Sequence, residues 1–143
     1  FCVKSFTVLR AERLGFDKLH LYDKGKVGIS AISFEDKQFN KLSDEHLSTI
    51  VDVIRSVEGV EIAVLIRQIE KERMFRVSMR ANVDFDVAAV CAKFGGGGHR
   101  RAAGATVEAK DVDRFLELAS KENLEATVVA TVTQEFVKIK NNI

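Results

Sequence analysis

The chain of 143 residues carries 22 Lys and Arg against 21 Asp and Glu, and 46% of its residues are hydrophobic. These values are ordinary for one globular domain with a core of its own, and they exclude a disordered or low-complexity chain. The net charge of +1 excludes a strong field over the whole surface, so an anion would have to be bound by a local cluster of cations.

The sequence also predicts a compartment. It holds neither a long apolar run nor a charged leader followed by an apolar stretch, so we expect no membrane span and no signal peptide. Cys2 and Cys91 lie far apart and form no metal-ligand pair, which favours two inert thiols in a reduced, cytoplasmic setting. The first residue is Phe1 rather than Met, from which we expect a piece of a longer protein.

The first third of the chain predicts a helix and a β-hairpin. Apolar residues over 5–14 indicate a short helix, which Gly15 would end. Two β-prone runs around an Asp and Gly turn predict a hairpin over residues 19–32. A polar stretch with no predicted element follows through Asn40.

A second helix is expected after Ser43, which is a plausible N-cap. His46 stands where a capping box would have Glu, so the box is expected to be incomplete. Gly59 would close this helix. Its apolar residues recur at helical spacing, at Leu47, Ile50, Val51 and Ile54.

The second half mixes strands and helices without strict alternation. Residues 60–66 are almost wholly apolar, which is typical of a strand covered on both faces, and residues 74–79 would be its partner across a turn at Lys71 and Glu72. Further strands are expected over 102–107 and 126–139, and helices over 86–94 and 111–119. The fold class is therefore α/β, a mixed β-sheet with packed helices in a single domain over residues 1–143.

The most conspicuous local feature is a run of four glycines, Gly95 to Gly98, followed by His99, Arg100 and Arg101. Four glycines are costly to order, and one would be enough to cap the preceding helix. Successive N–H groups in such a run can form a concave nest for an anion, and the basic residues would add charge-assisted donors. A flexible loop with a solvated basic flank is the alternative, because a glycine run alone is not a specific motif.

The wider context of this run is more specific. The stretch from Lys93 to Gly104, KFGGGGHRRAAG, resembles the GGGH-x-x-AAG signature of the DHH-associated domain of DHH-family phosphoesterases. Residues 56–67, 77–80 and 84–89 are similar to the strands and helix that precede it. The resemblance covers about residues 18–108 and is closest to the bacterial branch that degrades very short RNAs and dephosphorylates 3′-phosphoadenosine 5′-phosphate. The segment 124–143 has no counterpart and is expected to be an extra strand.

The resemblance implies a division of labour between two domains. An N-terminal DHH catalytic domain would bind two manganese ions, and the C-terminal domain would close over it and hold short RNA or a nucleotide phosphate. This chain is thus expected to carry no cofactor and to be catalytically silent alone. The implied substrate-binding residues are Gly96, Gly97, Gly98, His99 and Arg80, with Arg67 and Arg101 as weaker candidates.

The sequence departs from the family pattern at several points. It holds no DHH motif, and its histidines, His20, His46 and His99, are widely scattered. Arg100 stands where relatives often have proline, and Ala81 replaces a serine that is frequent after the arginine.

Two other functions stay open. A related domain of alanyl-tRNA synthetases serves in tRNA binding or dimerisation, but there an Ala-Gln element follows the glycines, so His99 favours the phosphoesterase branch. Cyclic-dinucleotide phosphodiesterases share the GGGH element. The preferred nucleotide and the oligomeric state, a homodimer included, are left open.

The sequence also makes predictions about geometry. Arg80 should lie on the same open face as His99, and neither should fill the core; otherwise Arg67 or Arg101 becomes the better candidate. Gly97 is expected to have a positive φ. Asp84 and Asp86 are expected to cap the following helix rather than bind a metal.

Overall fold

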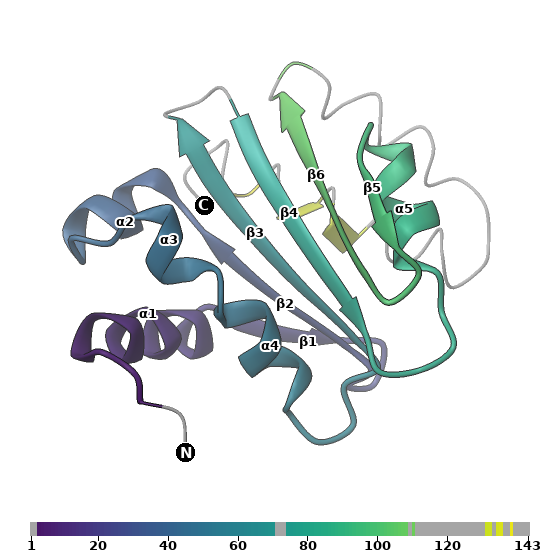
Figure 1. Ribbon diagram of the computed structural model, residues 1–143, viewed down its shortest axis with the longest axis horizontal. Helices are drawn as coiled ribbons and strands as arrows, with labels where there is room; N and C mark the ends of the chain where they lie inside the picture. Colours follow the sequence, from purple (N-terminus) through teal and green to yellow (C-terminus); the bar gives the residue numbers. More distant parts are fainter. Residues whose placement is uncertain are drawn as a thin grey trace.

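The computed structural model describes residues 3–70, 74–108, 110, 131–132, 134–135 and 138. The strands form one six-stranded sheet in the order β1-β2-β3-β4-β6-β5 (Figure 1). They are β1 (Leu19–Tyr22), β2 (Val27–Ile32), β3 (Ile62–Glu70), β4 (Met74–Ala81), β5 (Gly97–His99) and β6 (Ala102–Glu108). The helices are α1 (Phe6–Asp17), α2 (Phe34–Phe39), α3 (Asp44–Leu47), α4 (Ile50–Arg55) and α5 (Val87–Lys93). Among these described strands only β2 and β3 pair in parallel, so the predicted mixed α/β sheet is confirmed.

Strand β3 is the centre of the fold because both of its faces are buried. Ile62, Val64 and Ile66 belong to the core shared with α5, whereas Ala63 and Leu65 belong to the core under α1, α3 and α4. Figure 1 shows α1–α4 gathered beside the β1–β3 half of the sheet, with α5 next to β5 and β6. The prediction of a strand covered on both faces is confirmed.

Gly15 was expected to end the first helix, and this prediction is wrong. Helix α1 continues to Asp17, and Gly15 is buried within it. A Cβ at Gly15 would collide with the side chain of Ile50, so the glycine lets α1 and α4 approach closely. Close packing between helices therefore outweighs the cost of a glycine inside a helix.

The polar stretch before Asn40 contains a helix that the sequence reading missed. Ser33 caps α2 with a complete capping box: Asp36 N–H donates to Ser33 Oγ at 3.0 Å, and Ser33 N–H donates to the Asp36 carboxylate at 3.0 Å. At α3 the expected incomplete box is in fact closed by histidine, since Ser43 N–H donates to His46 Nδ1 at 3.1 Å. Local side-chain hydrogen bonds thus decide both helix starts.

Most other predicted elements are present as far as the described residues reach. They are the hairpin β1–β2, the partner strand β4, helix α5 and strand β6. The prediction of one helix after Ser43 closed by Gly59 is wrong: the segment forms two helices, α3 and α4, and α4 ends at Arg55. Gly59 has a positive φ of 87° in the turn before β3. The turn at Lys71 and Glu72 and the helix over 111–119 lie outside the described residues.

The expectation of a strand near the C-terminus is wrong wherever the structure describes it. Thr131, Val132, Gln134, Glu135 and Lys138 are helical. Val132 is fully buried in the core shared with α5, and Glu135 is buried and accepts a hydrogen bond from the Tyr22 hydroxyl. Tertiary burial here overrides the β propensity of the local sequence.

Candidate functional site

On the side opposite α5, none of the described helices covers β4, β6 and β5. Alternate residues of β4 and β6, such as Phe75, Val77 and Ala103, are buried against α5. The residues between them point to the other side and are half-buried or exposed. They are Arg76, Ser78 and Arg80 on β4, and Ala102, Gly104 and Thr106 on β6. We call this surface, together with Gly97 and His99, the open face.

The glycine run is not a loose loop. Gly95 has a φ of 82°, and its N–H and that of Gly96 donate to the carbonyls of Ala92 and Cys91 at 3.0 and 2.9 Å. Gly97 to His99 then form β5, which pairs antiparallel with β6. The first two glycine N–H groups therefore end helix α5 and are not arranged as an anion nest.

Three of the predicted site residues are glycines, and they have different surroundings. A Cβ at Gly96 would lie 2.6 Å from Ala105 Cα, and one at Gly98 would lie 2.7 Å from the Ala102 carbonyl oxygen. Gly98 also has a φ of 145°. A Cβ at Gly97 would meet no atom within 4 Å, and its φ is not positive, so the expected positive φ at Gly97 is wrong. Gly96 and Gly98 are thus required for the glycine run to approach β6 closely. Gly97, between them, lies on the open face and has no such contact.

The register brings Arg80 and His99 onto one row. Arg80 pairs with Ala102 on β6, and Ala102 pairs with His99 on β5. Directly paired residues point to the same side of a sheet, so all three lie on the open face, with Arg80 and His99 two strands, about 10 Å, apart. The prediction that Arg80 and His99 share an open face and stay out of the core is confirmed.

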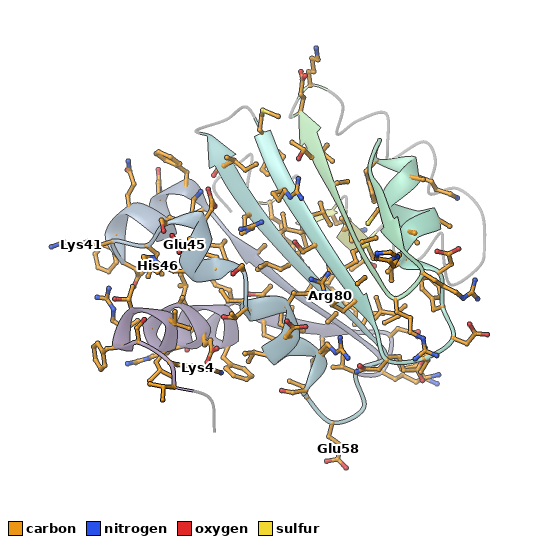
Figure 2. All side chains as sticks on the ribbon, viewed as in Figure 1. Lys4, Lys41, Glu45, His46, Glu58 and Arg80 are labelled. Carbon is orange, nitrogen blue, oxygen red and sulfur yellow. The ribbon has the colours of Figure 1, made fainter. Side chains whose placement is uncertain are left out.

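The cations of this row differ in what holds them. Figure 2 shows Arg80 on β4 beside α4, where its Nη1 donates to the Met79 carbonyl at 2.9 Å and its Nε lies 3.8 Å from an Asp52 carboxylate oxygen. His99 and Arg101 are exposed, and neither side chain has a polar partner within the described part of the chain. Arg80 is therefore held in place by neighbouring groups, while His99 and Arg101 keep their donors available.

Arg100 serves the fold. Its guanidinium lies 2.8 Å from Asp84 and 3.6 Å from Asp86, and its carbonyl accepts from Val87 N–H at 2.8 Å. Asp86 caps α5 by accepting from Ala89 N–H at 3.0 Å, as predicted. Asp84 neutralises Arg100 and is not a cap, so that part of the prediction is wrong. The residue that replaces the family's proline thus joins the β5–β6 turn to the start of α5.

Arg67 and Arg76 occupy the far end of the same side of the sheet, where they pair across β3 and β4. Arg67 Nη1 donates to the Asp44 carbonyl at 3.1 Å, and burial lowers the pKa of Arg67 while Asp44 opposes the shift. Arg76 is exposed, and its Nη1 donates to Thr106 Oγ1 at 3.0 Å. Sequence reasoning missed Arg76, although the alternation of Arg76, Ser78 and Arg80 was the signal that could have found it.

The residues that the structure describes contain no group of three or more His, Cys, Asp or Glu side chains placed to hold a metal ion. No described helix has the length and apolar character needed to cross a membrane.

Residues 24–125 match the DHHA1 domain family, which covers more than half of the chain and includes the whole open face. The chain belongs to this family. Over 75 residues the DHHA1 domain is 36% identical to the bifunctional oligoribonuclease and PAP phosphatase NrnA of Thermus thermophilus. That stretch is 52% of this chain but only 22% of the relative, so the matched part is a small portion of the longer protein.

Two solved structures have the same fold as this DHHA1 domain. An exopolyphosphatase-related protein from Bacteroides fragilis superposes with a TM-score of 0.68 at 20% identity, over 98% of this chain and 37% of that chain. A pGpG-specific phosphodiesterase from Vibrio cholerae superposes with a TM-score of 0.57 at 13% identity, over 87% and 41% of the two chains. At these identities the likeness concerns the fold alone.

Proposed function

We propose that this DHHA1 domain binds the phosphate of a nucleotide or short RNA for a manganese-dependent phosphoesterase of the oligoribonuclease and 3′-phosphoadenosine 5′-phosphate phosphatase type. One observation carries the proposal: Arg80 and His99 lie on one row of the open face, with only the methyl group of Ala102 between them. The 36% identity to an oligoribonuclease and PAP phosphatase supports the same substrate class.

The row suits a phosphate ester. Arg80 offers a planar fork that matches phosphate oxygens, and its contacts to Met79 and Asp52 limit its freedom before binding. His99 would donate a hydrogen bond from the opposite side of the phosphate. Arg101, at the turn beyond His99, would add a solvent-exposed charge. Ala102, with its small side chain, leaves room for the ligand to approach the backbone of β6.

The proposed role is positioning and charge neutralisation, since hydrolysis would take place on a separate DHH catalytic domain. The sequence holds no DHH motif, and manganese is expected on that partner domain, where it would activate the attacking water. Arg80 and His99 would hold the nucleotide phosphate while the partner domain closes over the open face.

Binding of AMP and of 3′-phosphoadenosine 5′-phosphate, measured by titration calorimetry, tests the proposal. Arg80→Ala and His99→Ala should each weaken binding by about 1–3 kcal/mol, the scale of a lost charge-assisted hydrogen bond. Arg13→Ala removes one exposed cation from α1 and serves as the matched control, with no change expected. If both site variants bind like the wild type, the open-face row is not the phosphate site.

The isolated chain should also be catalytically silent. With manganese present, it should hydrolyse neither a dinucleotide nor 3′-phosphoadenosine 5′-phosphate above a buffer blank. Its binding should weaken as salt rises, because exposed phosphate contacts are screened by ions. Turnover by the purified chain, or binding indifferent to salt, would contradict this division of labour.

A further inference from the structure

The far end of this side of the sheet brings together three cations, Lys37, Arg67 and Arg76, of which the first two share one carboxylate, Asp44. Arg67 and Arg76 are opposite each other on β3 and β4, and Lys37 Nζ lies 3.1 Å from the Asp44 carboxylate. The same carboxylate lies 4.0 Å from Arg67 Nη1, so one Asp44 serves two cations. Among the described side chains, Arg76 donates to the neutral hydroxyl of Thr106.

This arrangement costs stability when no anion is present. Like charges directly opposite each other on paired strands repel. Arg67 Nε is buried and has no hydrogen-bond partner among the described residues, and an unsatisfied buried donor is costly. The other cations of this sheet edge differ, since Arg80 has Asp52, and Arg100 has Asp84 and Asp86. A bound anion would relieve the repulsion between Arg67 and Arg76.

The spacing along β4 indicates how large the ligand is. Arg76 and Arg80 point to the same side and are four residues, about 13 Å, apart along the strand. Between them runs the row of Ser78, Gly104 and Gly97. Gly104 and Gly97 have no side chains, and Arg76 Nη2 would lie 3.7 Å from a Cβ at Gly104. The middle of the open face is therefore a strip in which Ser78 carries the one side chain of its row, and Arg76 and Arg80 stand at its two ends.

We propose that Arg67 and Arg76 form a second phosphate position, and that the glycine strip between the two positions holds the linking nucleoside. The ligand would then be a single-stranded oligonucleotide with phosphates on both sides of the strip, and a mononucleotide would fill only the Arg80 and His99 row. This inference rests on the proposed function, because it extends the same open face.

The test compares two ligands, AMP and a 5′-phosphorylated triadenylate. Wild type should bind the trinucleotide more tightly than AMP. Arg76→Ala should weaken trinucleotide binding about tenfold and change AMP binding less than about twofold, whereas Arg80→Ala should weaken both. Arg13→Ala, which removes a cation from α1, is the matched control and should affect neither ligand by more than about twofold.

A second variant tests the strip itself without removing charge. Gly97→Val should fold, because nothing lies within 4 Å of its Cβ position and its φ is not positive. The valine would stand on this strip, so it should weaken trinucleotide binding more than AMP binding. Circular dichroism of each variant checks that the fold is kept.

The outcomes separate the two proposals. If AMP binding depends on Arg80 but the trinucleotide binds no more tightly, or if Arg76→Ala weakens both ligands equally or neither, the second position is wrong and the proposed function stands. If the wild type binds neither ligand, or Arg80→Ala binds both unchanged, the proposed function fails and the second position fails with it.

Discussion

The structure assigns opposite sensitivities to two adjacent glycines. A methyl group at Gly96 would lie 2.6 Å from both Cα and Cβ of Ala105, and closer still to the Gly104 carbonyl oxygen. Two of these atoms are backbone atoms of β6, so β5 would have to move. A methyl group at Gly97 would enter open space with an unstrained backbone. Gly96→Ala should therefore destabilise the fold, whereas Gly97→Ala should not.

The expected magnitudes are well separated. Overpacking of this kind costs about 1–3 kcal/mol, whereas Gly97→Ala should be neutral or stabilising by about 0.4–1 kcal/mol through the entropy of the unfolded chain. With a urea dependence of about 1–3 kcal/mol per molar, the unfolding midpoint of Gly96→Ala should fall by roughly 1 M. Far-ultraviolet circular dichroism follows the transition. Equal unfolding midpoints for the two variants, or a lower midpoint for Gly97→Ala, would refute the conclusion that Gly96 packs against β6 and Gly97 does not.

Three further predictions concern buried or capping groups. Burial and then the hydrogen bond to Glu135 raise the pKa of Tyr22, the only tyrosine, above its ordinary 10.0. Because the folded state favours the neutral phenol, this contribution to stability should be present below pH 10.0 and be lost as the pH rises further. In a near-ultraviolet titration, Glu135→Gln should lower the midpoint of Tyr22 ionisation. An unchanged midpoint would contradict the contact between Tyr22 and Glu135. Burial raises the pKa of Cys91 to about 11. In a Cys2→Ser chain, a thiol reagent should therefore modify Cys91 only when the chain unfolds, and rapid modification of the folded chain would contradict this prediction. Ser33→Ala should cost about 0.5–2 kcal/mol in urea unfolding through the lost cap of α2, and no loss would show that the cap is dispensable.

Sequence periodicity predicted the sheet well where burial and local pattern agree. The apolar run of β3 and the alternation along β4 follow directly from which sides are covered. The shared face of Arg80 and His99 was predicted from the strand–helix–loop order, and the strand register confirms it. The roles of these residues in binding stay a prediction.

The sequence predicted less where distant contacts decide the outcome. Gly15 permits helix packing against Ile50, a contact that no local signal indicates. The described residues from Thr131 to Lys138 are helical, with Val132 buried in the core that α5 also shares, although their sequence favours a strand. The alternation along β4 could have placed Arg76 on the same side as Arg80, but its position opposite Arg67 follows only from the register of β3 and β4.

The glycine run illustrates how one motif can serve both the fold and a ligand. Its first glycines end α5, and Gly96 and Gly98 bring β5 against β6 on the side toward α5. Because the side-chain period of a strand is two residues, the same pairing turns Gly97 and His99 to the open face. A Cβ at Gly97 would meet no atom within 4 Å, so packing does not require a glycine at this position. The requirement for glycine at 96 and 98 is structural, and the glycine at 97 is where the proposed ligand would approach the backbone.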